Sequence, residues 1–175
     1  NGINKMAGEW YHILYNNVYG IKTCSLRLTN TYGPRQLMKH NRQGFIPWFI
    51  RLALEDKEIQ VWGGEQKRDI NYIDDVVDAF LLAAASDATN GEIYNLGHHK
   101  PISLKGFTET LVKVSGSGSY VIKEFPEERK KIDVGDTYCS YDKIFRELVW
   151  QPKVSLEEGL TKTIEFYKKY KEHYF

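Results

Sequence analysis

Three residues combine a side chain suited to ligand binding with a position at the end of a predicted strand. Asn30 follows the predicted strand 23–28 at its carboxyl end, where open α/β sheets bind their ligands. Trp62 ends the next predicted strand, and Arg68 begins another. An amide forms directed hydrogen bonds, an indole stacks on flat rings, and a guanidinium holds phosphate through paired hydrogen bonds. The alternatives for the three are a structural turn, a buried strand tryptophan and a surface ion pair.

Several well-defined chemical motifs do not occur in the sequence. It has no phosphate-binding loop ending in Gly-Lys-Ser/Thr, no His-Glu-x-x-His, no paired Cys-x-x-Cys and no Gly-x-Ser-x-Gly. Gly116-Ser117-Gly118 lacks the third glycine of a dinucleotide fingerprint and lies after a predicted helix and before a strand, the reverse of the required order. We therefore expect no phosphate-binding glycine loop in this sequence.

Two clusters of ionisable residues have simpler explanations than catalysis. Asp74, Asp75 and Asp78 lie at the start of a predicted helix, where carboxylates interact favourably with the positive helix end, and Asp74 is the expected N-cap. The adjacent His98 and His99 are expected to be solvated in a turn rather than to bind a metal. The sequence therefore predicts no metal site.

The composition is that of an ordinary globular domain. Of the 175 residues, 42% are hydrophobic and 27% are charged, which is enough apolar material for a sizeable core. The formal net charge is +1, so no nucleic-acid partner is expected. No apolar stretch approaches the roughly 20 residues that cross a bilayer, and there is no secretory signal, so we expect a cytoplasmic protein without membrane contact. Cys24 and Cys139 are expected to be reduced thiols, with a disulfide as the alternative.

Hydrophobic periodicity predicts alternating helices and strands, which is typical of an α/β fold, here with two small sheets. Residues 30–34 are predicted to form a loop, and Ser103 and Ser155 to be helix N-caps. Helix 3–19 has apolar residues on two sides, so we expect it to be buried between a sheet and a second layer, often a partner subunit. With their caps, the predicted helices are 3–19, 46–55, 74–85, 103–114, 141–148 and 155–170, and the predicted strands are 23–28, 58–62, 68–73, 92–96 and 120–124.

A series of short motifs carries more information in its order than any one of its members does alone. The motifs are NGINKMAGE at 1–9, LRLTNTYGPRQ at 26–36, VWG at 61–63, KRDINYIDDV at 67–76, IYNLG at 93–97 and WQPKVSLEEGL at 150–160. In this order and at this spacing the sequence resembles the extended short-chain dehydrogenase/reductase family, the NAD-dependent nucleotide-sugar epimerases and dehydratases. The resemblance extends over essentially the whole chain.

The resemblance implies a division of the chain. Residues 1–36 would hold the last helix and strand of an NAD-binding Rossmann half, and residues 37–175 would form the small mixed α/β substrate-binding region, interleaved with Rossmann elements. Members of the family begin with a glycine-rich Rossmann half that binds the NAD pyrophosphate, and the sequence does not contain it. The chain is therefore expected to be the C-terminal half of such an enzyme.

The family's catalytic pair is Tyr-x-x-x-Lys on a helix, where the tyrosine exchanges a hydroxyl proton while hydride passes to or from the nicotinamide. Lys5 stands at the lysine position, which implies that it lowers the tyrosine pKa and holds the nicotinamide ribose. Asn1 stands at the tyrosine position and cannot form an anion near neutral pH. An artefact at the first residue, a truncated gene product and a natural pseudoenzyme are competing explanations. This chain alone is expected to be inactive.

The resemblance also assigns contacts to the residues that follow the strands. Thr29 and Asn30 would contact the cofactor, and Asn30 would also bind the diphosphate of the substrate. Trp62 would lie beside the base of the substrate, and Arg68 would bind its phosphate. Asn95 matches an asparagine that contacts the nucleotide in some members, with a structural turn as the alternative.

A later arginine of the family, in an Arg-Pro-Gly-Asp motif, is altered in this chain. Counted from Asp133, Lys130 falls at the arginine position, and Arg129 lies next to it. Either could reach a phosphate, and a solvated charged loop is the alternative.

These implications predict the C-terminal portion of an NAD-dependent epimerase or dehydratase that acts on a UDP- or dTDP-sugar through a transient keto intermediate. Epimerisation, dehydration and decarboxylation remain open, as does the identity of the sugar. A homodimer through helix 3–19 is expected. The alternative is a non-catalytic nucleotide-binding or scaffold module derived from the same family.

Overall fold

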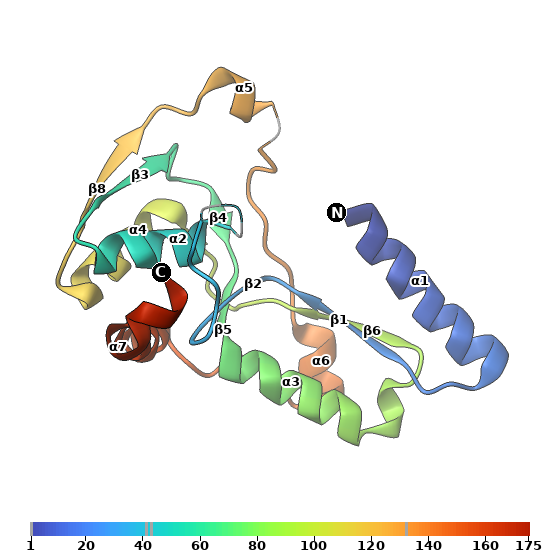
Figure 1. Cartoon of the computed structure of the whole chain (residues 1–175). Coiled ribbons are helices and arrows are strands. Elements are labelled where there is room, and N and C mark those ends of the chain that lie inside the picture. Colours follow the sequence, from blue (N-terminus) through green and yellow to red (C-terminus); the bar gives the residue numbers. More distant parts are fainter. Residues whose placement is uncertain (1, 41, 43, 132) are drawn as a thin grey trace.

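Figure 1 shows the computed structural model of the chain, in which two regions lie side by side. One is built on the strands β1 (Cys24–Leu28) and β6 (Glu92–Leu96), and the other on β3 (Glu58–Trp62) and β8 (Ser119–Lys123). Both pairs are parallel, and the chain is a mixed α/β fold, as the sequence predicts. The structure describes residues 2–40, 42, 44–131 and 133–175, with the backbone alone at residue 129.

Helices lie on both faces of the β1–β6 pair because the side chains of β1 alternate between the two faces. Those of Ser25 and Arg27 contact α1 (Gly2–Tyr19), whereas those of Cys24 and Leu26 pack on a small core beneath α3 (Ile73–Ala85) and α6 (Asp142–Leu148). The buried members of this core are Val76, Ala79, Tyr94, Leu96, Ile144 and Trp150.

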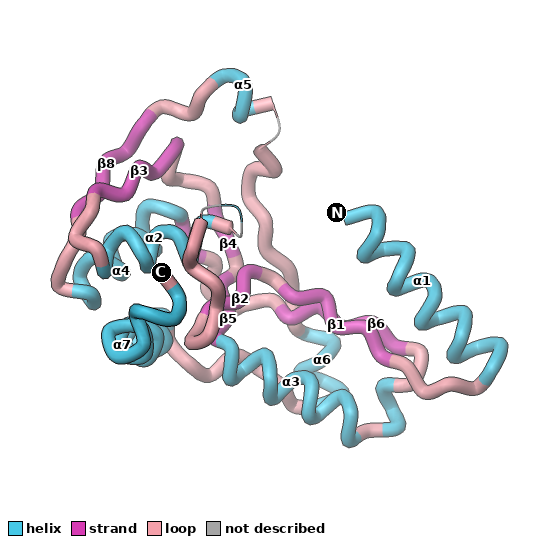
Figure 2. Tube along the Cα trace, in the orientation of Figure 1, coloured by secondary structure: helices cyan, strands magenta, loops and turns pink. Residues whose placement is uncertain are grey.

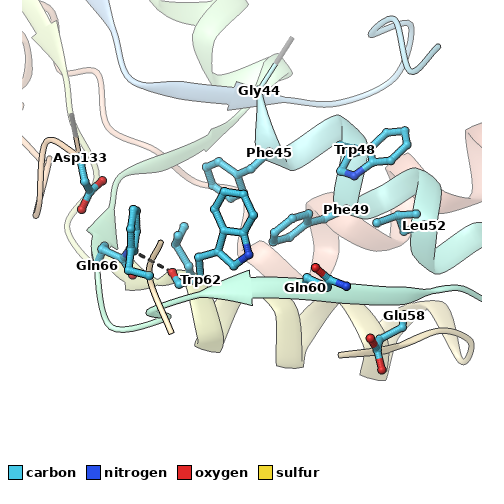
Figure 3. Close-up of a pocket in the computed structure, with 12 residues that line it drawn as sticks. Gly44, Phe45, Trp48, Phe49, Leu52, Glu58, Gln60, Trp62, Gln66 and Asp133 are labelled. Atoms are coloured by element: carbon cyan, nitrogen blue, oxygen red, sulfur yellow. Dashed lines mark hydrogen bonds between the residues drawn. The ribbon is translucent and has the colours of Figure 1, made fainter. Parts of the chain in front are cut away.

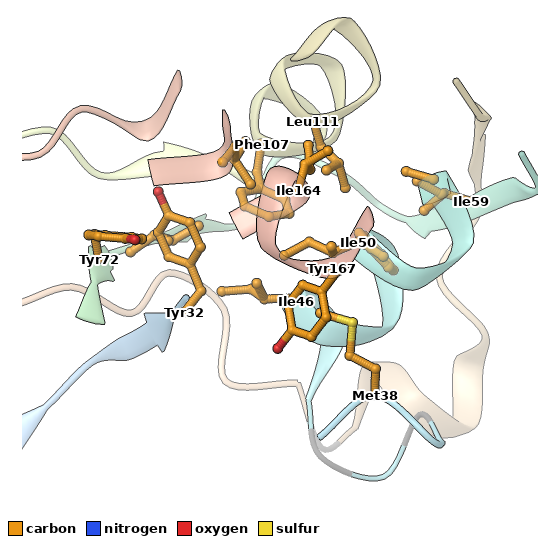
Figure 4. Close-up of a cluster of buried hydrophobic side chains, with 14 of the residues drawn as sticks. Tyr32, Met38, Ile46, Ile50, Ile59, Tyr72, Phe107, Leu111, Ile164 and Tyr167 are labelled. Atoms are coloured by element: carbon orange, nitrogen blue, oxygen red, sulfur yellow. The ribbon is translucent and has the colours of Figure 1, made fainter. Parts of the chain in front are cut away.

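The larger core belongs to the β3–β8 region (Figure 4). Alternation along β3 buries Ile59 and Val61 and leaves Glu58 and Gln60 exposed. Three helices pack around this core, namely α2 (Phe45–Leu54), α4 (Leu104–Ser115) and α7 (Leu156–Tyr174). Its buried members are Tyr32, Met38, Ile46, Phe49, Ile50, Ala53, Ile59, Val61, Ile70, Tyr72, Phe107, Leu111, Leu160, Ile164 and Tyr167.

Two short strand pairs join the regions (Figure 2). The parallel pair is β2 (Asn30–Tyr32) with β5 (Ile70–Tyr72), and the antiparallel pair is β4 (Lys67–Arg68) with β7 (Ile102–Ser103). The described residues therefore form four two-stranded pairs where two sheets were expected. A 3₁₀ turn at Asp87–Thr89 and the short helix α5 (Glu127–Lys130) complete the elements.

Two local predictions were wrong at this junction. Residues 30–34 were expected to be a loop but begin with β2, and the single strand expected at 68–73 is divided into β4 and β5. The division falls at Asp69, whose carbonyl accepts the Asn30 amide and whose own amide donates to Thr137. Pairing with these distant segments sets the strand boundaries, and local sequence patterns do not contain it.

Serine N-caps were predicted correctly. Ser103 Oγ accepts from the Gly106 amide at the start of α4, and Ser155 Oγ accepts from the Glu158 amide at the start of α7. The N-cap of α3 was predicted wrongly, since Tyr72 occupies it with no side-chain cap bond.

Asp75 has a role that capping does not explain. It is 3% exposed, and its Oδ2 accepts from the backbone amides of Lys153 and Val154 at 3.1 and 3.0 Å. Its backbone carbonyl accepts from Trp150 Nε1 at 2.7 Å. Asp75 therefore fixes the loop that leads from α6 to α7.

Helix α1 was expected to be buried on two sides, and within this chain it is not. None of its residues is buried, and Trp10 is 64% exposed. The helix is held to β1 by polar contacts: Arg27 donates twice to Glu9, at 2.8 and 2.7 Å, and Thr23 Oγ1 donates to the His12 carbonyl. Its apolar side chains need a partner outside the described residues to become buried.

Two smaller observations concern the cysteines and the membrane. Cys24 and Cys139 are free thiols, as predicted. Among the described helices, none combines the length and apolar character that crossing a bilayer requires.

Removing the charge of Glu9 should loosen α1. The hydrogen bonds from Arg27 hold the pKa of Glu9 below its usual value. The ion pair therefore stabilises the fold above the pKa of an unfolded glutamate, about 4.3, and this contribution is lost as pH falls through the lower folded-state pKa. We expect Glu9→Gln to cost about 0.5–1 kcal/mol and to speed amide hydrogen exchange in α1 at pH 7. Equal exchange in both proteins would contradict this assignment.

Replacing Asp75 should destabilise the fold more than replacing its exposed neighbour on the same helix. Asp75→Ala leaves two partly buried backbone amides without their acceptor, for an expected cost of about 2–3 kcal/mol in urea unfolding. Asp78→Ala, the matched control, should change the free energy of unfolding by less than about 0.5 kcal/mol. Similar losses in the two variants would show that both carboxylates act through the helix end alone.

Candidate functional site

A pocket of about 590 Å³ lies between α2 and β3 (Figure 3). One wall is α2, with Gly44 at its N-cap, and the other side presents the outward side chains of β3. Gln66 after β3, Leu104 of α4, Phe125 after β8 and Asp133 complete the lining. The pocket thus lies beside the larger core, on elements that the core holds in place.

Five aromatic rings dominate the lining, those of Phe45, Trp48, Phe49, Trp62 and Phe125. The Phe45 and Phe49 rings meet edge to face with centroids 5.6 Å apart, and those of Trp62 and Phe125 meet at 6.4 Å. Flat apolar walls of this kind suit a flat, largely uncharged ligand group.

The turn after β3 positions Trp62. Gln66 Nε2 donates to the Trp62 carbonyl at 3.1 Å, and Gln66 Oε1 accepts from the Gly64 amide at 2.8 Å. Gly63 has a φ of +71°, and a Cβ there would come within 3.0 Å of the Gln66 amide. Glycine at this position lets Gln66 close the turn and fix the end of the strand.

Arg68 reaches the same pocket through Asp133. Its Nη1 donates to the carbonyls of Lys67, at 2.8 Å, and Gly135. Its Nη2 lies 3.6 Å from Oδ1 of Asp133, which lines the pocket. Asp133 therefore links the predicted phosphate-binding residue to the pocket that the predicted base-stacking residue lines.

Asn30 and Thr29 lie at the carboxyl end of β1, as predicted. Asn30 Nδ2 donates to the Asp69 carbonyl at 3.1 Å, and Thr29 Oγ1 donates to the Leu96 carbonyl at 3.0 Å. Asp69 lies between the end of β4 at Arg68 and the start of β5. The residue that accepts the Asn30 hydrogen bond is therefore the sequence neighbour of Arg68.

Sequence reasoning missed Asn71. This buried asparagine donates from Nδ2 to Thr29 Oγ1 at 3.1 Å and to the Leu96 carbonyl at 2.8 Å, tying the ends of β1, β5 and β6 together. Its Oδ1 has no hydrogen-bond partner among the described residues. The signal in the sequence was the position of this polar residue between an isoleucine and a tyrosine in a short strand.

Lys5 lies on the exposed surface of α1. Glu9, one turn further along the helix, contacts Arg27 in β1. Because α1 and β1 run in opposite directions, Lys5, one turn before Glu9, lies towards the carboxyl end of β1. Asn1, at the predicted tyrosine position, lies outside the described residues.

Two other predicted contacts are not part of the pocket lining. Asn95 is in β6 opposite Arg27, and Lys130 is exposed in α5; neither lines the pocket. The side chain of Arg129 lies outside the described part of the chain. The assignments of these residues to a nucleotide remain predictions.

The two histidines and the glycine pair that were not assigned to catalysis take part in local packing and helix capping. The rings of His98 and His99 stack with centroids 4.5 Å apart, and no group of three potential metal ligands occurs among the described residues. Gly116 is the left-handed C-cap of α4, and a Cβ on Gly118 would collide with Ala53.

Comparison with known proteins adds independent evidence. A family model described as the NAD dependent epimerase/dehydratase family matches residues 2–97. UDP-glucose 4-epimerase of Mycolicibacterium smegmatis is 32% identical over 165 residues, which cover 94% of this chain and 51% of that protein.

Solved structures agree with this match. The structure of UDP-glucose 4-epimerase from Thermotoga maritima with UDP-glucose is similar with a TM-score of 0.85 and 34% identity, covering 97% of this chain and 53% of that one. The Bordetella bronchiseptica enzyme WbmF in complex with NAD+ and UDP gives a TM-score of 0.80 and 26% identity, covering 94% of this chain and 51% of that one.

The chain spans about half the length of the relatives it matches. The matches cover nearly all of it and include both strand regions. The chain belongs to the NAD-dependent epimerase/dehydratase family.

Proposed function

We propose that this chain is the C-terminal, substrate-binding portion of an NAD-dependent epimerase or dehydratase acting on a UDP- or dTDP-sugar. One observation carries the proposal: Trp62, assigned to the base from sequence, lines an aromatic pocket together with Asp133, and Asp133 contacts Arg68, assigned to the phosphate. The relatives that share the fold are described with UDP-glucose and with UDP, which supports this class of ligand.

Different residues in and around the pocket bind different parts of such a ligand. The aromatic walls take the base by stacking, because rings of this kind exclude water and offer flat contact area. Arg68, which contacts the lining residue Asp133, binds the diphosphate through its guanidinium. The sugar then extends towards the carboxyl end of β1, where Asn30 and Lys5 lie.

The residues at the end of β1 fit one end of NAD. Lys5 has three ammonium donors and no ion pair among the described residues, and Leu28 presents apolar surface that is 48% exposed. Lys5 and Asn30 would hold the nicotinamide riboside, and the bound cofactor supplies hydride transfer. The tight packing of Gly118 against Ala53 does not fit the pyrophosphate, so the rest of the cofactor needs other residues.

The isolated chain should bind ligand without turning it over. Lys5 carries the positive charge that would acidify a neighbouring hydroxyl, but Asn1, at the tyrosine position, has no group that exchanges a proton near neutral pH. In a protein with a tyrosine at that position, Lys5 would lower its pKa so that it could take a proton from the sugar hydroxyl.

The alternative is a non-catalytic nucleotide-binding module, and the identity of Asn1 favours it. Both readings place the nucleotide in the same pocket. Titration with NAD tests the alternative in one direction: tight NAD binding by this chain would contradict a binding module, whereas weak or no binding agrees with both readings.

Residues 1–36 and 37–175 are proposed to be the end of a Rossmann half and the substrate-binding region. The exposed apolar residues of α1, together with Phe80 and Leu81 of α3, support this division. They lie on the outer faces of the β1–β6 pair, where further strands and helices would cover them. A cytoplasmic location and a homodimer through α1 are part of the same proposal.

Ligand binding by the aromatic pocket can be measured by calorimetric titration of the chain with UDP. We expect Trp62→Ala to weaken binding about tenfold or more, because base–aromatic stacking contributes about 1–3 kcal/mol. Trp62→Phe keeps a flat ring and should retain most of the affinity. Trp10→Ala, an exposed tryptophan on α1, is the control and should bind as the wild type does. Unchanged binding in Trp62→Ala would contradict the proposed site.

Self-association through α1 can be measured by sedimentation. Leu14 is 48% exposed and belongs to the apolar surface of α1, so Leu14→Asp should shift a dimer towards monomer. Asn17→Asp adds the same charge at an exposed polar position of the helix and should leave the association unchanged. A wild-type chain that stays monomeric at high concentration would overturn the proposed dimer.

A further inference from the structure

The charges around the aromatic pocket are not those of a strong anion site. Among the described residues that line it, Glu58 and Asp133 are carboxylates, and none is a lysine or an arginine. One nearby cation is Arg68, which meets the pocket through Asp133. A nucleoside diphosphate carries its negative charge into these surroundings, so the charges that face the Arg68 guanidinium affect how strongly the phosphates bind.

Arg68 is held in place without help from Asp133. Nη1 donates to the carbonyls of Lys67 and Gly135, which belong to β4 and to the segment that follows α5. Two backbone acceptors from different segments fix the orientation of the planar guanidinium.

Asp133 acts on Arg68 through its charge. The separation of 3.6 Å between Nη2 and Oδ1 is too long for a hydrogen bond, so the contact is Coulombic. Both side chains are largely buried, at 12% and 23% exposure, which reduces screening by solvent. In the described part of the chain, Asp133 has no other polar contact that would compensate its charge.

Two further carboxylates lie beside the segment that carries Arg68, and both accept hydrogen bonds from backbone amides. Oδ2 of Asp69 accepts from the Cys139 amide at 2.7 Å, and Oδ1 of Asp136 accepts from the Lys67 amide at 2.8 Å. These two hold the local backbone together. Asp133 differs from them because its contact is with the guanidinium itself.

We propose that Asp133 is a specificity-determining residue that weakens diphosphate binding at Arg68, so that the site selects its ligand chiefly through the base and ribose. This rests on the proposed function, in which the pocket holds the base and Arg68 the phosphates. The carboxylate offsets the guanidinium charge and repels an approaching phosphate. Uridine and UDP should therefore bind the wild-type chain with affinities within about threefold of each other.

The test is calorimetric titration of the whole chain, at low salt, with UDP and with uridine as the uncharged probe. Asp133→Asn removes the charge and keeps the shape, and should strengthen UDP binding about five- to tenfold while leaving uridine binding unchanged. Asp133→Ser is a second variant with the same expectation. Arg68→Gln combined with Asp133→Asn should abolish the gain, because the gain requires the guanidinium.

Glu58→Gln is the matched control, since Glu58 lines the same pocket and does not contact Arg68. It should leave the ratio of UDP to uridine affinity unchanged. An equal gain in Glu58→Gln would overturn the specific role of Asp133. Weaker binding of UDP in Asp133→Asn and Asp133→Ser, with both proteins folded by circular dichroism, would make Asp133 a positioning residue and also overturn it.

The same titrations distinguish a failure of the proposed function from a failure of the proposed role of Asp133. If neither the wild type nor Asp133→Asn binds uridine or UDP, the pocket is not a nucleotide site, and both proposals fall. If the wild type binds both ligands through Trp62 but Asp133→Asn leaves their ratio unchanged, the nucleotide site stands and only the role of Asp133 is wrong.

Discussion

The arrangement of the site depends on one buried residue, Asp69. Its carbonyl accepts two hydrogen bonds from Asn30, its amide donates to Thr137, and its carboxylate accepts from the Cys139 amide. These bonds join β2, the β4–β5 junction and the segment after α5. Burial raises the pKa of Asp69, and the hydrogen bond that its carboxylate accepts from the Cys139 amide partly offsets this rise. Without these hydrogen bonds, the position of Arg68 relative to Asn30 would not be fixed.

Local sequence patterns predicted the elements that local physics determines. The alternation in 58–62, the serine caps of α4 and α7, and the strand 92–96 depend on residues close in sequence. The division of 68–73 and the strand at Asn30 depend on pairing with residues that are far away in the chain. The same reason explains Asp75, which was read as a helix-end carboxylate because its true partners lie 78 and 79 positions further on.

The pocket was predicted only in part, for a related reason. Trp62 and Arg68 could be found because each stands beside a strand end in a recognisable motif. Phe45, Trp48 and Phe49 are indistinguishable in sequence from the apolar face of any buried helix, and only the position of α2 opposite β3 shows that they face a pocket. Asp133 lies close to a charged run, and only its distance from Arg68 separates it from a solvated loop residue.

The two regions differ in how completely the chain covers its own apolar surface. The β3–β8 region encloses a core with helices on its sides, and the pocket lies on elements that this core supports. The β1–β6 region has a small core, and the apolar side chains of α1 remain exposed. A rigid pocket requires only the first region, whereas the proposed reaction also requires groups placed against the open face of the second. Ligand binding and the proposed catalysis therefore depend on different regions of the chain. A ligand recognised by stacking, with its diphosphate only weakly held at Arg68, could bind this portion before the parts needed for hydride transfer are in place.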